Sequence, residues 1–98
     1  MFEHTFHREP AIRWIEFQAV KGHLILTRDK LSFLCEDPDN GADWSVTLRH
    51  LDKVDYFKKL ELFRGNLLVI GKDGEVNRFG VEDHRSWKER ILRSARAV

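Results

Sequence analysis

The fold of this chain is decided by residues 74–91, Gly-Glu-Val-Asn-Arg-Phe-Gly-Val-Glu-Asp-His-Arg-Ser-Trp-Lys-Glu-Arg-Ile. The first part of this stretch alternates apolar and polar residues, as a half-buried strand does, and places Phe79 and Val81 on one face. The second part repeats apolar residues at four-residue spacing from Trp87 to Ile91, as an amphipathic helix does. The sequence therefore predicts a strand that runs directly into a helix.

The helix is predicted over residues 83–96, with Asp83 as its N-cap. Such a helix is only about 21 Å long, and an isolated helix of this length is not stable in water. The upstream chain must therefore supply a surface that covers its apolar stripe.

Composition bounds the class of protein. The 98 residues are 42% hydrophobic and 34% charged, which is typical of one folded domain over residues 1–98. Seventeen basic and sixteen acidic residues nearly cancel, so attraction to nucleic acid or membrane would need a local patch. The single cysteine, Cys35, has no internal disulfide partner, and no apolar run has the length of a membrane span. We expect a cytoplasmic protein, and peripheral attachment to the membrane is the alternative.

Upstream of the helix the chain reads as short strands separated by turns. We expect residues 1–10 to form an arm without regular structure and residues 11–81 to form a β-barrel. The predicted strands cover residues 11–20, 23–27, 31–35, 44–48, 53–58, 67–70 and 75–81. The predicted turns lie at residues 21–22, 28–30, 36–43, 64–66 and 72–74. About seven antiparallel strands followed by one helix indicate a small barrel or orthogonal sandwich that the helix caps.

The alternation also predicts which side chains face the core. In the first strand Ile15, Phe17 and Ala19 share the face expected to be buried, and Ile12 and Trp14 fall on the other. Either a bulge near Trp14 shifts the register, or the start of this strand is apolar on both faces and packs against a partner there. In the later strands the predicted inward residues are Leu24, Leu26, Leu31, Phe33, Trp44, Val46 and Leu48.

Several segments together resemble a known family. These are residues 22–27, 30–33, 44–48 and 66–70, with Leu51, Val54, Asp73-Gly74, Phe79, Trp87 and Ile91. In order and spacing they resemble the GRAM branch of the pleckstrin-homology-like superfold, over roughly residues 12–96. The resemblance implies two near-orthogonal antiparallel sheets of about four and three strands, with Trp87 and Ile91 plugging the barrel. It also implies a non-catalytic module that binds phosphoinositides, other anionic lipids or protein segments.

The chain departs from the lipid-binding pattern at one end of the predicted barrel. In lipid-binding relatives the loop between the first two strands is long and basic, and it closes on phosphates together with two further loops. Here the predicted first loop is only Lys21-Gly22. The loop after the third strand carries four carboxylates, which would repel a phosphate. They belong to Glu36, Asp37, Asp39 and Asp43.

Other chemistries have weaker support. Residues 37–43 faintly suggest a calcium loop, but Leu48 stands where an EF-hand needs glutamate, so a solvated turn is the better interpretation. The five histidines show no zinc spacing, and no nucleophile has a recognisable catalytic setting. Residues 77–81 loosely suggest an RNA-recognition strand, although the helix which that fold needs between its first strands is missing. We therefore expect no enzyme, no cofactor, no metal and no nucleic acid.

The candidate binding residues form three groups. Arg85, Lys88 and Arg93 lie on the terminal helix, whose dipole explains part of the basic bias. Trp14 marks the outer face of the first strand. Lys58, Lys59 and Arg64 form a second basic group. We expect contacts with a protein partner or a second copy, through strand edges or the Trp14 face, and the alternative is peripheral binding to anionic lipid through a basic surface patch.

Overall fold

The computed structural model describes residues 5–56 and 65–97. Seven strands and one α-helix are found in this part of the chain, with two short 3₁₀-helices between strands. The elements are β1 (Thr5–Ile15), β2 (Gln18–Thr27), β3 (Lys30–Cys35), η1 (Pro38–Asn40), β4 (Trp44–Thr47), η2 (Leu48–His50), β5 (Leu51–Tyr56), β6 (Gly65–Gly71), β7 (Val76–Val81) and α1 (His84–Arg96).

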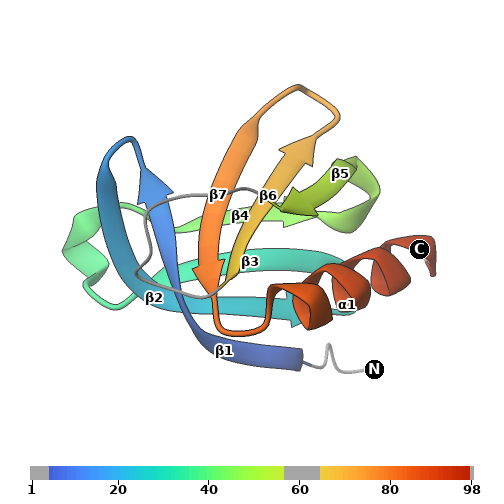
Figure 1. Cartoon of the computed structure of the whole chain (residues 1–98), viewed down its shortest axis with the longest axis horizontal. Coiled ribbons are helices and arrows are strands. Elements are labelled where there is room, and N and C mark those ends of the chain that lie inside the picture. Colours follow the sequence, from blue (N-terminus) through green and yellow to red (C-terminus); the bar gives the residue numbers. More distant parts are fainter. Residues whose placement is uncertain (1–4, 57–64, 98) are drawn as a thin grey trace.

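The strands form one continuous antiparallel sheet in the order β4-β3-β2-β1-β7-β6-β5. Strand β1 joins its two halves, because Ala11 pairs with Gly22 of β2 and Arg13 pairs with Phe79 of β7. The sheet curls so that β6 and β7 cross the direction of β2 and β3, and α1 lies across the lower opening (Figure 1). The predicted architecture, mainly β with about seven antiparallel strands and one C-terminal helix, is confirmed.

The core fills the inside of this curled sheet. Leu24, Leu26, Leu31 and Phe33 are at most 1% exposed, as their alternation predicts, and Leu48 is equally buried. Trp44 and Val46 are half-buried and pack against this core. Period-two alternation therefore identified the inward face of β2, β3 and β4 correctly.

The first hairpin differs from the prediction. Strand β1 begins at Thr5, so residues 5–10 are not an arm, and residues 1–4 lie outside the described part of the chain. The turn lies at Glu16 and Phe17, where Glu16 has a φ of 57°, and not at Lys21-Gly22. A left-handed φ is uncommon for a residue other than glycine, and the sequence therefore gave little sign of a turn there.

Gly22 lies in the middle of β2, where it pairs with both Ala11 and Cys35. A Cβ atom at this position would overlap the carbonyl oxygen of Leu34 and lie 2.7 Å from the Phe33 ring. The glycine is therefore needed because β2 and β3 approach closely, and not because the chain turns.

The second half of the sheet shows smaller shifts. Strand β5 covers Leu51–Tyr56 instead of residues 53–58, and the predicted end of that strand lies outside the described residues. Gly65 and Asn66, predicted in a turn, begin β6. The predicted turn at residues 72–74 is confirmed, because the Gly74 amide donates to the Gly71 carbonyl at 2.9 Å.

Helix α1 begins as predicted. The Asp83 carboxylate accepts a hydrogen bond from the Ser86 amide at 3.0 Å and caps the first turn. Trp87 and Ile91 are fully buried and contribute to the same core as Phe79 and Val81. Within the described residues, α1 is too short and too polar to cross a membrane.

Candidate functional site

One end of the barrel is built from the turn at residues 16–17, the loop at residues 36–43 and the turn at residues 72–75. We call it the loop end. Side chains from β1, β4 and β7 tie these connections together, as the following contacts show. The β1–β2 hairpin projects beyond the sheet at the upper left of Figure 1, away from the C-terminal end of α1.

Arg13 is the central side chain of the loop end. Its Nη1 donates to the Ala42 carbonyl at 2.8 Å, and its Nη2 donates to the Asn77 Oδ1 at 2.9 Å. The Asn77 Nδ2 and the Trp44 Nε1 both donate to Oε1 of Glu75, at 3.0 and 3.1 Å. Burial lowers the pKa of Arg13, and the Glu75 carboxylate partly offsets this effect. The outer nitrogens of Arg13 are therefore used within the domain, while its buried Nε has no hydrogen-bond partner among the described residues.

Two carboxylates of the acidic loop, those of Asp43 and Asp37, accept hydrogen bonds that stabilise the loop itself. Asp43 Oδ1 accepts hydrogen bonds from the Cys35 amide at 2.7 Å and from the Cys35 thiol at 3.0 Å. These hydrogen bonds lower the pKa of Asp43, and the same contact raises the pKa of the Cys35 thiol. Asp37 accepts from the Asp39 amide at 3.0 Å and caps η1. In the part of the chain that is described, no three acidic, histidine or cysteine side chains come together as metal ligands would.

The remaining acidic charge of this loop borders a shallow hollow of about 500 Å³ beside the start of β2. The hollow is lined by Ala19, Val20, Lys21, Glu36, Asp37 and Asn40. The Glu36 amide donates to the Lys21 carbonyl at 2.9 Å, so the acidic loop is held against β2. Two exposed carboxylates and one lysine give the lining of this hollow a net negative charge.

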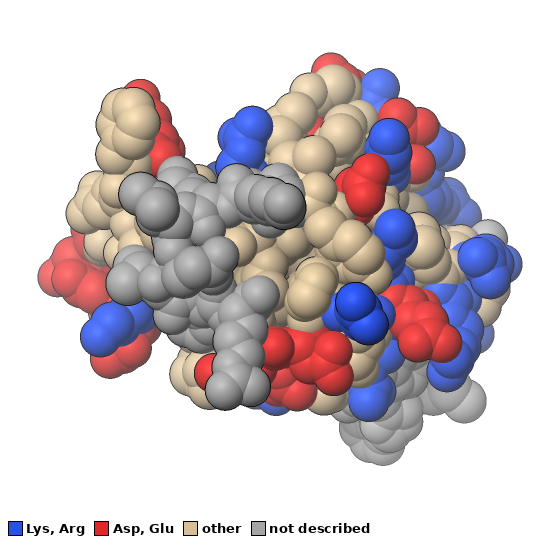
Figure 2. Space-filling model, viewed as in Figure 1, with Lys and Arg blue, Asp and Glu red and all other residues tan. Residues whose placement is uncertain are grey.

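Phe17 stands at the tip of the β1–β2 hairpin with 97% of its surface exposed. The predicted core position for Phe17 is wrong, and Ile15, on the same predicted face, is 37% exposed. The cause is the turn at Glu16 and Phe17, which ends β1 before the alternation can bring these side chains inward. Figure 2 shows the hairpin projecting at the upper left, with acidic and basic side chains side by side along the left edge below it.

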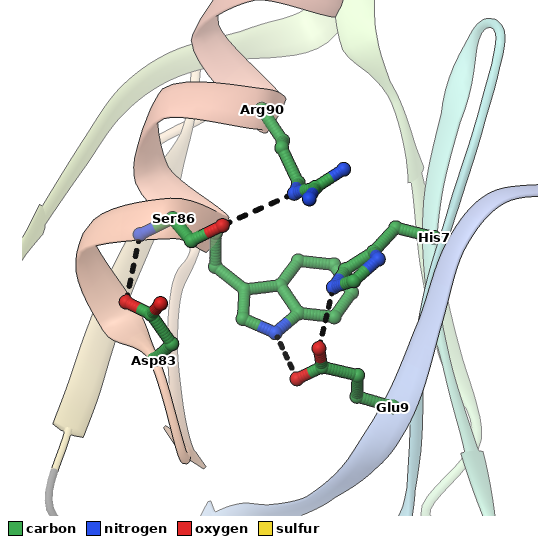
Figure 3. Close-up of polar contacts among 6 residues, drawn as sticks. His7, Glu9, Asp83, Ser86 and Arg90 are labelled. Carbon is green, nitrogen blue, oxygen red and sulfur yellow. Dashed lines mark hydrogen bonds and ion pairs between the residues drawn. The ribbon is translucent and has the colours of Figure 1, made fainter.

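The opposite end of the barrel is closed by α1. The Trp87 indole is fully buried, and its Nε1 donates to the Glu9 Oε2 at 3.2 Å. His7 contacts the other Glu9 oxygen at 2.7 Å, and its ring lies 4.7 Å from the Trp87 ring (Figure 3). The start of β1 is thereby fastened to the helix.

The basic residues predicted on α1 lie in different surroundings. Lys88 lies 4.6 Å from the centre of the Tyr56 ring and 3.8 Å from Asp55, so it contributes to the contact between α1 and β5. Arg93 pairs with Glu89 at 3.5 Å, and Arg85 is exposed. Exposed pairs of this kind contribute little to stability, so Arg93 stays accessible to a ligand.

The other predicted site residues do not join the loop end. Trp14 is half-buried on the outer face of β1, where its Nε1 lies 3.4 Å from the Asn66 Oδ1. Lys58, Lys59 and Arg64 lie outside the described residues. The binding role of all these residues stays a prediction. Phe17 was missed because an exposed aromatic residue and a core aromatic residue look the same in an alternating segment.

Comparison with known proteins gives structural similarity only. No family model and no curated protein sequence matches the chain. The C-terminal domain of an unknown protein from Leishmania infantum superposes with a TM-score of 0.77 at 14% identity, over 98% of this chain and 86% of that chain. The Vps36 N-terminal PH domain gives a TM-score of 0.74 at 15% identity, over 97% of this chain and 80% of that chain.

The Slm1 PH domain, solved in complex with phosphoserine, gives a TM-score of 0.67 at 18% identity, over 89% of this chain and 91% of that chain. These sequence identities are too low to assign a function. They also do not distinguish the GRAM branch from other PH-like domains. The curled seven-stranded sheet, its closing helix and these superpositions show that the chain has the fold of pleckstrin-homology domains.

Proposed function

We propose that this domain is a non-catalytic binding module whose loop end contacts a protein partner. The observation that carries this proposal is Phe17, a large apolar side chain that is 97% exposed at the tip of a hairpin. The two-residue turn holds the ring away from the sheet, so nearly its whole surface is available for burial by a partner. Burying one such side chain contributes roughly 1.5–3 kcal/mol, which is the size of an interface anchor.

The charges around Phe17 indicate the chemistry of the partner. Glu16 precedes it in the turn, and Glu36 and Asp37 line the hollow that begins at Ala19. A protein surface with an apolar pocket and basic residues at its rim complements this arrangement. An anionic bilayer or a phosphate group would be repelled by the same carboxylates.

Arg13 gives a second reason to favour protein over phosphate. Both of its outer nitrogens donate to groups of the domain itself. These two contacts fix the direction of the guanidinium toward Ala42 and Asn77, and its charge is already partly balanced by the nearby Glu75 carboxylate. The Slm1 PH domain was solved with phosphoserine, so an anionic ligand is the main alternative to a protein partner.

The proposal is tested with a photo-reactive phenylalanine analogue at position 17 of the full chain, in cells that produce it. We expect ultraviolet light to join position 17 to protein. The same analogue at Arg85, an exposed position on α1, is the control and should give little protein adduct. Lipid adducts at position 17, or equal protein yields from both positions, would contradict the proposed function. Lipid adducts at position 85 alone would support the alternative that α1 contacts an anionic membrane.

A further inference from the structure

We infer that one protein partner of the loop end is a second copy of this chain, bound head to tail. This inference rests on the proposed function, because it uses Phe17 as the anchor. The inference goes further by naming the surface that binds Phe17. That surface lies at the C-terminal end of α1.

The first observation is that charge is segregated along the molecule although it nearly cancels overall. Exposed carboxylates outnumber exposed lysines at the loop end. The carboxylates belong to Glu16, Glu36, Asp37, Asp39, Asp43, Asp73 and Glu75, and the lysines are Lys21 and Lys72. Exposed basic residues outnumber acidic ones around the C-terminal end of α1, where Arg28, Arg49, Arg93 and Arg96 lie together with Asp29 and Glu89. Figure 2 shows that Lys and Arg side chains predominate on the right, opposite the projecting hairpin, with acidic side chains among them. We call this second region the basic end.

The second observation is a hollow of about 540 Å³ at the basic end. It lies between the β2–β3 turn, η2 and the residue that follows α1, and its lining is Arg28, Asp29, Thr47, Arg49 and Ala97. The Leu48 amide donates to the Asp29 carbonyl at 2.8 Å and fixes η2 against the turn. The hollow has the volume to accept a phenyl ring, and its lining is mostly polar. Arg28 and Arg49 offer guanidinium groups that can stack on the face of an aromatic ring and also attract the carboxylates that accompany Phe17.

These two surfaces lie on the same chain and have opposite charge. A second copy of this chain therefore carries a loop end that complements the basic end of the first. A surface that differs from the one it binds gives a heterologous contact, which repeats into open chains or closes into a ring. The contact is small, one hairpin tip in one hollow, so we expect weak association. Because its complementarity is largely electrostatic, association should be strongest at low salt.

Two blocked variants test the inference. Phe17→Ser with Asp37→Lys disables the loop end and leaves the basic end intact. Arg28→Glu with Arg49→Glu disables the basic end and leaves the loop end intact. Lys53→Glu, on the exposed surface of β5, is a control that reverses one charge outside both surfaces. Arg49→Glu alone repeats the second test should the double substitution disturb folding, and circular dichroism checks that every variant is folded.

Sedimentation equilibrium then measures the average mass at low and high salt. We expect the wild-type chain and Lys53→Glu to associate at millimolar concentration and low salt, and to dissociate at high salt. Each blocked variant should associate at least about tenfold more weakly on its own. An equimolar mixture of the two should form a one-to-one dimer and nothing larger, because only one intact pair of surfaces is left.

Three results would overturn the inference: a wild-type chain that stays monomeric, blocked variants that still associate alone, or a mixture that does not pair. Failure here is separable from failure of the proposed function. A monomeric chain whose position 17 still cross-links to another protein refutes self-association and leaves the proposed function standing. A monomeric chain with no protein adduct at position 17 refutes both.

Discussion

Replacement of Trp87 by alanine is expected to lower the free energy of unfolding by about 3–5 kcal/mol, the usual cost of removing a fully buried tryptophan. Trp87 has no exposed surface and fills the end of the barrel beneath α1. Its loss also removes the indole donor to Glu9 and the ring that His7 contacts. The substitution therefore opens a cavity and loosens the attachment of β1 to the helix at the same time.

Urea unfolding followed by circular dichroism measures this effect. Trp87→Phe keeps an aromatic ring and loses the hydrogen bond, so it should cost less than the alanine variant. Arg93→Ala, on the exposed side of the same helix, should change the free energy of unfolding by no more than about 0.5 kcal/mol. Equal losses for Trp87→Ala and Arg93→Ala would show that α1 does not close the barrel.

Gly22→Ala should also destabilise the fold strongly, by about 3 kcal/mol, the upper end of the usual cost of overpacking. The added methyl group would meet the Leu34 carbonyl and the Cα atom of Cys35, both of which are backbone groups. Backbone atoms of a paired strand cannot move aside as a flexible side chain can. Strands β2 and β3 would have to separate at the point where Gly22 pairs with Cys35.

Gly41→Ala is the matched control for this prediction. Gly41 has a φ of 72°, and no atom lies within 4 Å of the place its Cβ would occupy. Its substitution should therefore cost only the strain of a left-handed backbone, about 1–2 kcal/mol. If thermal or urea unfolding gave the same loss for both variants, close packing at Gly22 would not be the reason for the glycine.

The sequence predicted the closing strand and helix because several local signals agree there. The alternation of Phe79 and Val81, the Asp83 cap and the spacing of Trp87 and Ile91 all specify the same structure, and all four apolar side chains are fully buried. Agreement between capping and periodicity is what makes such a segment predictable.

The first hairpin could not be predicted in the same way. Ile15, Phe17 and Ala19 alternate as in a continuous strand, and the turn between them contains no glycine, proline or asparagine. Gly22 looked like a turn residue because close strand packing and a turn both favour glycine. The single shift of the turn from residues 21–22 to residues 16–17 moved Phe17 from the predicted core to the most exposed apolar position described.

Of the candidate site, only the acidic character of residues 36–43 could be predicted from the sequence. The four carboxylates of this loop predict that it is unsuited to phosphate. The structure adds that the loop contacts Arg13, because the Ala42 carbonyl accepts a hydrogen bond from it. Periodicity could not find this contact, because it joins residues twenty-nine positions apart. The basic positions Arg85, Lys88 and Arg93 follow from composition, but the Tyr56 and Asp55 contacts of Lys88 depend on how α1 packs against β5.

We propose that the loop end of this PH-like fold contacts protein and does not accept phosphate. Backbone amide chemical shifts of the full chain, titrated with phosphoserine and with inositol hexakisphosphate, test it most directly. We predict that the signals of residues 16–21, 36–43 and 72–77 stay in place at millimolar ligand, because carboxylates surround the loop end and Arg13 is held by Ala42 and Asn77. Saturable shifts of these signals, together with those of the Arg13 side chain, would contradict the account.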